Sequence, residues 1–378
     1  MKKIIIYGVS IKNLEIRRSI EHFLDGGYEI AGYSDGHYTR DVLDNKTFIP
    51  LEELPERDFD FILLTTASAN VYAELRRSLA ALGISPDKII RPMMFLGKDG
   101  AKKQVDLIAD IDRRRHEETG LIFGMSYSAW GILEEKLDRP FYNCSQPGMD
   151  LYYNYRVYRY MVEKGFLSRV ETALFVLPYF YFEYDMSRSL GQYEAGQMFS
   201  IWRLDDWHHA REVPAAREYI ENYRMFGEKI SRFYHVPKQP YSPGNSYGQA
   251  DGTAVPSPRW FSDYKDTIEE NKALFSRFLQ EIKAEGEAVV IVPPYYVNGL
   301  SRLSKRIFQA KKEKFYRILS ELEEQNGKIR VFDYTDAFEG RRERFADLDH
   351  LNREGAEAFT ELINREVLGG RGGGGASA

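Results

Sequence analysis

The sequence predicts an α/β protein with two parallel sheets, each covered by helices in a three-layer arrangement. Short apolar segments alternate with amphipathic helical patterns twice along the 378 residues, and a strongly charged stretch separates the two series. Such alternation is typical of parallel sheets, because every crossover between parallel strands brings a helix onto a face of the sheet. The length also favours two domains, since a typical domain has roughly 100–200 residues.

The first domain is predicted over residues 1–96. It opens with the apolar run KIIIY, which ends at Gly8, and a helical pattern follows that stops at Gly26 and Gly27. Further strands are expected in YEIAGYSD, FDFILLTT and DKIIRP, with a helix from about Asn70 to Leu82. This order of strands and helices predicts a small parallel sheet.

A connecting helix is predicted over residues 97–118, where charged residues surround apolar residues at helical spacing. The second domain is predicted over 119–368, with strands in LIFG, FYNC, TALFVLP, AVVIVPP and KIRVFDY. Its rhythm breaks over about 178–262, a segment rich in Pro, Gly, Ser and Asn that we interpret as an insertion or lid. The glycine-rich residues 369–378 are expected to form a flexible tail.

Composition disfavours several classes of function. The chain has 52 Lys and Arg against 57 Asp and Glu, a formal charge of −5, and its basic residues form no stripe that would suit a nucleic acid. No segment reaches the roughly 18 apolar residues of a membrane helix, and the charged first residues do not fit a signal peptide. We therefore expect a cytoplasmic protein without a membrane span.

Cysteine and histidine usage predicts neither a metal site nor redox chemistry. Cys144 is the single cysteine, so an internal disulfide is excluded and no zinc-site spacing occurs. His208 and His209 are adjacent but lack a carboxylate at a matching spacing. No metal and no cofactor are therefore expected.

Aromatic residues are unusually frequent, with 26 Tyr, 23 Phe and 4 Trp, and many lie between Tyr142 and Tyr264. Two interpretations remain open. The rings fill the core, or they form a surface that faces a sugar or a partner, since tyrosine combines a flat apolar ring with a polar hydroxyl.

Ser126 is a candidate nucleophile. It follows the apolar strand LIF in the sequence GMSYS and precedes the helical stretch AWGILEEKL. At the carboxyl end of a parallel strand and the amino end of a helix, free backbone N–H groups can stabilise an oxyanion. A serine at this position can also serve only as a helix N-cap, so the motif alone leaves both roles open.

His350 is a candidate general base. It lies in DLDHLNREG, where Asp347 precedes it by three residues on a turn. A carboxylate in that position can accept the Nδ1 proton and hold Nε2 outward toward a serine hydroxyl. Of the seven histidines, His350 alone has such a context.

Together these motifs resemble the SGNH (GDSL-like) hydrolase and acyltransferase superfamily over roughly residues 119–367. The family's nucleophile follows the first strand, as Ser126 does, and its terminal Asp-x-x-His matches Asp347 and His350. FYNCSQPGMDLYYNY is similar to the family's second block, with Gly148 in the place of the glycine whose amide serves the oxyanion hole. The resemblance implies a flavodoxin-like domain and acyl transfer through a Ser-His-Asp triad without a cofactor.

The chain departs from this family pattern in one place. After TALFVLP many members carry Gly-x-Asn-Asp, whereas this chain reads YFYFEYDMS. The third oxyanion donor is therefore missing or comes from elsewhere, and removal of one such donor can cost on the order of 3 kcal/mol of transition-state stabilisation. Further along, HLNREGAEAF resembles the version found in surface-polysaccharide and teichoic-acid acyltransfer members.

The first domain resembles the amino-terminal Rossmann-like domain of bacterial sugar acetyltransferases and related glycan-modification proteins. Pro50 to Leu54 match a recurring Pro-Leu-Glu-Glu-Leu loop, and Asp60 accompanies the strand that follows. A dinucleotide is disfavoured, because the segment after the first strand has one glycine, Gly8, where the fingerprint needs three. Asp35 can bind a ribose or form a turn with Gly36, so nucleotide-sugar binding and a docking role both remain open.

These resemblances imply a serine-dependent esterase or O-acyltransferase that acts on an acylated carbohydrate or a surface-glycan precursor, with glycan-biosynthesis proteins as partners. Water or a sugar hydroxyl as the acyl acceptor distinguishes the two reactions, and the sequence does not choose between them. The alternative is a non-catalytic binding or scaffold protein that recognises a nucleotide-sugar or a partner enzyme.

Overall fold

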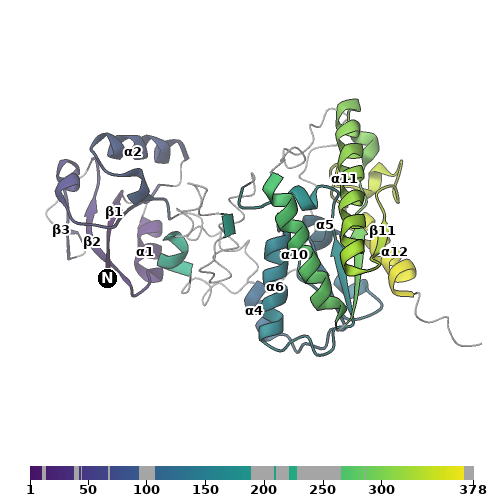
Figure 1. Cartoon of the computed structure of the whole chain (residues 1–378). Helices are drawn as coiled ribbons and strands as arrows, with labels where there is room; N and C mark the ends of the chain where they lie inside the picture. Colours follow the sequence, from purple (N-terminus) through teal and green to yellow (C-terminus); the bar gives the residue numbers. More distant parts are fainter. Residues whose placement is uncertain are drawn as a thin grey trace, which may run out of the picture. The chain divides into compact units, whose positions relative to one another are not determined.

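The computed structural model describes residues 1–10, 14–37, 42–43, 45–66, 69–92, 107–188, 208–209, 221–227, 265–284 and 286–369. The chain divides into two compact units. Residues 1–112 with 195–239 form the first, and 113–194 with 240–378 form the second. Each unit has its own parallel sheet with helices (Figure 1), so the predicted α/β class with two parallel sheets is confirmed.

The first unit contains a sheet of four parallel strands in the order β2-β1-β5-β6. Its elements are β1 (Lys2–Tyr7), α1 (Leu14–Phe23), β2 (Tyr28–Ser34), η2 (Leu51–Glu56), β5 (Phe61–Leu64), α2 (Ala69–Ala81), η3 (Pro86–Lys88) and β6 (Ile89–Ile90), with the antiparallel pair β3 (Val42–Leu43) and β4 (Lys46–Thr47). The side chains of Ile4, Ile5 and Ile6 are all buried, as expected for a parallel strand covered on both faces.

A short π-helical segment, η8 (Tyr223–Gly227), belongs to the core of the first unit. Met225 and Phe226 are fully buried in the cluster that contains Ile4 and Ile20. The Asp25 N–H donates to the Met225 carbonyl at 2.7 Å. From the sequence alone, these residues are predicted to belong to the insertion of the second domain. Their packing differs because a helical pattern shows which side chains of a segment are apolar, but not which sheet they cover.

Five parallel strands form the sheet of the second unit, in the order β11-β10-β9-β7-β8. They are β7 (Gly120–Phe123), β8 (Phe141–Asn143), β9 (Thr172–Val176), β10 (Glu287–Val292) and β11 (Arg330–Asp333). The first strand of the unit, β7, therefore lies between the second and the third. In sheets of this kind ligands bind outside the carboxyl ends of the strands, where the strand order reverses.

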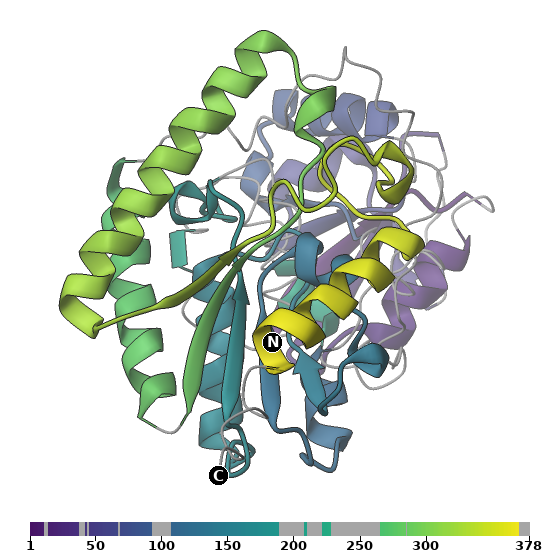
Figure 2. The same cartoon turned by 90° about the vertical axis from the view of Figure 1, so that its right-hand side faces the viewer.

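Helices cover both faces of this second sheet. The helices are α5 (Ser126–Gly131), α6 (Leu151–Glu163), α10 (Lys265–Lys283), α11 (Arg302–Asn326) and α12 (Arg353–Leu362), and the shorter turns are η5 (Glu134–Lys136), η6 (Tyr181–Glu183), η10 (Val297–Gly299), η11 (Arg342–Arg344) and η12 (Ile363–Leu368). Helix α10 contacts α6 and α11, whereas α12 contacts α5. Figures 1 and 2 show α6 and α10 on one side of the sheet and α12 on the other.

Aromatic rings fill much of the core of the second unit. Phe278 of α10 lies 4.9 Å from Phe123 and 4.8 Å from Phe175, measured between ring centroids, and Tyr158 of α6 packs against the same ring. These aromatic side chains are buried, so they fill the core, as one of the two interpretations of the aromatic content predicts.

Three predicted features lie partly outside the described residues. Helix α4 (Leu107–Arg113) falls within the predicted connecting helix, whose residues 97–106 are not among those described. Most of the predicted insertion over 178–262 and nearly all of the predicted tail over 369–378 are likewise outside them. Among the described helices, none combines the length and the apolar character needed to cross a bilayer.

Candidate active site

Ser126 begins α5 directly after β7, at the carboxyl edge of the second sheet. Gly124 makes the turn possible. A Cβ on Gly124 would lie 2.3 Å from the Ser128 Oγ and 2.8 Å from the Val176 carbonyl oxygen. Both distances are far below van der Waals contact, so this close approach of β7, α5 and β9 requires glycine. The turn therefore fixes where the Ser126 hydroxyl emerges from the sheet.

Asn154 holds the same turn from α6. Its Oδ1 accepts the Gly124 N–H at 3.0 Å, and its Nδ2 donates to the Gly124 carbonyl at 3.0 Å. The Tyr181 hydroxyl lies 2.7 Å from that Nδ2 and donates to the Met149 carbonyl. No sequence motif pointed to Asn154 as a part of the site. The available signal was a single amide side chain among the tyrosines of LYYNYRVYRY.

His350 meets Ser126 across 224 positions of sequence. Its Nε2 lies 2.8 Å from the Ser126 Oγ, and its Nδ1 lies 2.9 Å from Oδ2 of Asp347. Oδ1 of Asp347 accepts the backbone N–H groups of Asp349 at 2.9 Å and His350 at 2.7 Å. A tight turn thus fixes the carboxylate beside the imidazole. The structure brings together Ser126, His350 and Asp347 with the spacing of a nucleophile, a base and an orienting acid.

Two aromatic side chains of α5 lie against the imidazole of His350. The Tyr127 ring stacks on it with centroids 5.3 Å apart, and the Trp130 ring lies 4.8 Å away. The Tyr127 hydroxyl also donates to Oδ2 of Asp349 at 2.9 Å. Helix α5 therefore supplies the candidate nucleophile and also limits the orientations of the ring that would act on it.

Asp349 places a second carboxylate at the imidazole, with its Oδ1 3.2 Å from the His350 Nδ1. Burial disfavours the charged imidazole, but the negative charges of Asp349 and Asp347 outweigh it and raise the pKa of His350 from 6.5 to about 10. For Asp349, burial opposes ionisation, while the positive charge of His350 and hydrogen bonds from His350 and Tyr127 hold the pKa below its usual range. At neutral pH the imidazole is therefore mostly protonated, with Nε2–H donating to Ser126.

A pocket opens beside Ser126 and His350. It encloses about 210 Å³, including space open to solvent, and its lining comes from α5 and from the segments that follow β10 and β11. The residues are Ser126, Tyr127, Trp130, Gly131, Pro293, Pro294, Asp349, His350 and Leu351. A pocket at the carboxyl ends of parallel strands is the usual place for a small ligand in such a sheet.

Gly148 lies in the loop between β8 and α6 with a φ of +76°, a conformation that favours glycine. Its carbonyl accepts the Tyr184 hydroxyl at 2.7 Å, and Oδ2 of Asp150 accepts the Met186 N–H at 2.8 Å. The segment after β9 has no Gly-x-Asn-Asp motif, and it braces this loop through Tyr181 and Tyr184. The role of the Gly148 amide as an oxyanion donor stays a prediction.

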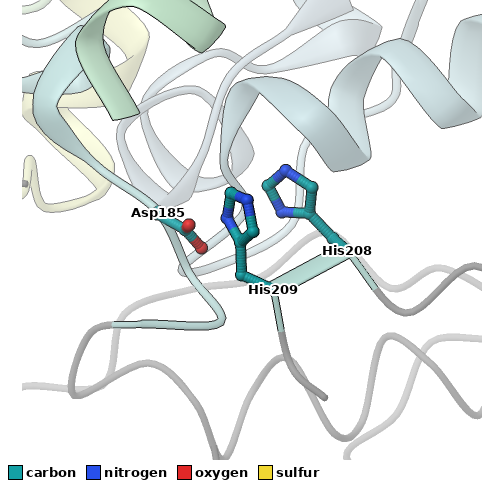
Figure 3. A group of neighbouring side chains, drawn as sticks. All are labelled: Asp185, His208 and His209. Atoms are coloured by element: carbon teal, nitrogen blue, oxygen red, sulfur yellow. The ribbon is translucent and has the colours of Figure 1, made fainter. Parts of the chain in front are cut away.

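Figure 3 shows side chains that belong to different units. In the first unit the rings of His208 and His209 lie 4.0 Å apart. In the second, Asp185 accepts hydrogen bonds from the Ser187 N–H and hydroxyl. Because the relative positions of the two units are not determined, these three side chains do not define one site.

Asp35 of the first unit follows β2. Its Oδ2 accepts the Val9 N–H and its Oδ1 accepts the His37 N–H, both at 2.9 Å. Gly8, at the end of β1, has a φ of +100°. Since both oxygens of Asp35 already bind the backbone of this unit, the geometry favours the turn interpretation over a ribose ligand.

A family model described as C2185-like, N-terminal, matches residues 1–90. These residues lie within the first unit and include all four strands of its sheet. No curated protein matches the chain. The match therefore concerns the first unit, and the function of the second has to be argued from its own site.

Proposed function

We propose that this protein transfers or hydrolyses acyl esters through a Ser126–His350–Asp347 triad. The observation that carries the proposal is the 2.8 Å contact between the Ser126 Oγ and the His350 Nε2, with Asp347 on the opposite nitrogen of the ring. This pairing of a hydroxyl, an imidazole and a carboxylate activates serine nucleophiles on unrelated folds. Its location beside a pocket at the carboxyl edge of the sheet supports the same conclusion.

The reaction follows from the roles of these groups. Neutral His350 takes the Ser126 proton while Oγ attacks the ester carbonyl carbon, and the amides of Ser126 and Gly148 are the proposed donors to the developing oxyanion. The intermediate collapses, and the leaving alcohol takes the proton from Nε2. Water or a sugar hydroxyl then attacks the acyl-Ser126 ester with His350 again as base, which releases the product and restores Ser126. Asp347 stabilises the imidazolium in both steps.

The proposed substrate is an acylated carbohydrate or a surface-glycan precursor. The proposal rests on the resemblance of HLNREGAEAF to glycan acyltransfer members of the SGNH superfamily and on the likeness of the first domain to the amino-terminal Rossmann-like domain of sugar acetyltransferases. The strand order β8-β7-β9-β10-β11 supports a flavodoxin-like, SGNH-type second domain. A cytoplasmic location and glycan-biosynthesis proteins as partners belong to the same proposal.

A non-catalytic binding or scaffold protein that recognises a nucleotide-sugar or a partner enzyme is the second candidate. Two observations favour it. The raised pKa of His350 keeps the proposed base protonated at neutral pH, and the segment after β9 lacks the asparagine that serves as an oxyanion donor in related sequences.

A fluorophosphonate probe separates the two candidates, because it reacts covalently with activated serines. Wild type, Ser126→Ala and the control Ser168→Ala, which changes an exposed serine of the same unit, are incubated with the probe at pH 7 and pH 9.5. We expect wild type and Ser168→Ala to be labelled and Ser126→Ala to stay unlabelled. A folded wild type that is unlabelled at both values would favour the binding protein.

A further inference from the structure

The imidazole of His350 contacts two carboxylates through one nitrogen. Nδ1 lies 2.9 and 3.1 Å from the two oxygens of Asp347 and 3.2 Å from Oδ1 of Asp349. One N–H can be shared between acceptors on both sides, so neither contact excludes the other. A triad needs only one of these acids, which leaves Asp349 without an assigned role.

Asp349 has its own supports, separate from those of Asp347. Its Oδ2 accepts the Tyr127 hydroxyl at 2.9 Å, and the Tyr295 hydroxyl is hydrogen-bonded to the same carboxylate. Tyr295 follows β10 and its side chain is buried, while Tyr127 lies on α5 next to Ser126. Asp347 is fixed by backbone N–H groups of its own turn instead. Side chains from α5 and from the segment after β10 thus hold the Asp349 carboxylate in place beside His350.

We infer that Asp349 is a positioning residue that, together with Asp347, forms a two-carboxylate clamp on the Nδ1 of His350. The inference rests on the proposed function of Ser126 and His350. Asp349 contacts the base and not the reacting atoms, so it acts through the imidazole. The clamp holds Nε2 toward Ser126 and places a second negative charge beside the ring.

The negative charge of Asp349 makes His350 a stronger base. It also means that the imidazole carries its proton in a larger fraction of molecules at pH 7. The titratable groups around the ring are Ser126 and Tyr127 of α5, Tyr295 after β10, and Asp347 and Asp349 of its own turn. Both tyrosines hydrogen-bond to Asp349, and burial raises the pKa of Tyr295 well above its usual value. The two carboxylates are therefore the charges that set the protonation of His350.

NMR titration of the histidine ring signals tests the clamp without any need for catalysis. The signal of His350 is assigned by its loss in His350→Gln, and its midpoint is measured in wild type, Asp349→Asn and the control Asp336→Asn, which removes a charge from an exposed turn. We expect Asp349→Asn to lower the midpoint by about one pH unit or more, and Asp336→Asn to leave it unchanged. An equal midpoint in folded Asp349→Asn and wild type would overturn the inference.

Two further measurements make the test decisive. Asp349→Ala removes the same charge and introduces no amide group that could form other hydrogen bonds. It replaces Asp349→Asn in the titration if Asp349→Asn does not fold. The pH at half-maximal rate of fluorophosphonate labelling should move in the acid direction with the NMR midpoint, which a merely structural role of Asp349 would not cause. If wild type is never labelled, the proposed function fails, and the NMR midpoints still decide the role of Asp349.

Discussion

The two sheets of this protein share a strand order but differ in how the polar groups at their carboxyl edges are used. In both, the first strand lies between the second and the third parallel strand. In the first unit, Asp35 and Thr65 bind backbone groups at the end of β1. In the second, Ser126 and His350 bind each other at the end of β7, beside a pocket. The shared strand order thus places polar side chains at the carboxyl edge of each sheet. Only the contacts between those side chains make the edge of the second sheet a candidate active site.

This difference has a simple physical basis. Each oxygen of Asp35 accepts a backbone N–H group, so this carboxylate stabilises a turn. Asp347 accepts two backbone N–H groups through Oδ1 and keeps Oδ2 for the imidazole of His350. A hydroxyl hydrogen-bonded to an imidazole can still lose its proton to that partner.

Replacement of Ser126 by alanine should abolish acyl transfer, because no other group at this edge occupies the place of the nucleophile in the proposed reaction. We expect a loss of about 10⁴-fold or more in turnover of a chromogenic acetyl ester. The melting temperature should change by only a few degrees, since a single hydroxyl and its hydrogen bond to His350 are lost. A variant that retains most of the wild-type turnover would remove Ser126 from the mechanism.

Asp347→Asn should lower turnover by about 10³–10⁴-fold, because the amide no longer stabilises the imidazolium or fixes its tautomer. His350→Ala should be at least as damaging, since the base itself is lost. Both variants should also lower the melting temperature by several degrees at pH 7, because each removes a stabilising contact between the imidazole and a carboxylate. The check is kcat together with thermal unfolding of the same preparations, and full activity of either variant would contradict the assignment.

The rate of fluorophosphonate labelling should rise with pH. His350 acts as a base only when neutral, and with a pKa of about 10 the neutral fraction at pH 7 is about one in a thousand. We expect the rate to increase by nearly tenfold per pH unit above pH 7 and to level off near pH 10. A rate that is already maximal at pH 7 would show that the base titrates near its ordinary value.

The same pKa gives a stability effect of defined sign. A raised pKa in the folded state means that the protonated imidazole stabilises the fold fully below about pH 6.5, and this contribution is lost as the pH rises through about 10. The melting temperature of wild type should therefore fall more steeply between pH 7 and pH 10 than that of His350→Gln. Parallel curves for the two proteins would contradict the raised pKa.

The sequence predicted the two parallel sheets because the strands are apolar on both faces, as in KIIIY and TALFV, and strand and helix patterns alternate clearly. The contact between Ser126 and His350 was also expected, since each motif has a local signature. Asn154, Tyr127 and Asp349 were not foreseen as parts of the site. Their contacts join α6, α5 and the turn after β11, and such contacts depend on tertiary packing that no local pattern records.

The predicted insertion shows that the sequence pattern also does not assign a whole segment to one of the two units. Met225 and Phe226 fall in the predicted insertion of the second domain, in a part with a helical pattern, whereas they are buried with Ile4 and Ile20 of the first unit. Periodicity describes which side of a segment is apolar. It does not identify which of two sheets, each with apolar faces to cover, that side will contact.

Asp35→Asn should have the smallest effect on catalysis and a clear effect on stability. Its carboxylate accepts two backbone N–H groups, whereas an amide can accept with one oxygen only, so we expect a loss of about 1–2 kcal/mol in the free energy of unfolding of the first unit. Fluorophosphonate labelling of Ser126 should keep the wild-type rate. Urea unfolding followed beside the control Glu56→Gln, an exposed acid of η2, measures the first quantity. Unchanged stability together with impaired labelling would reverse the contrast between the two edges, because Asp35 would then serve the reaction and not the turn.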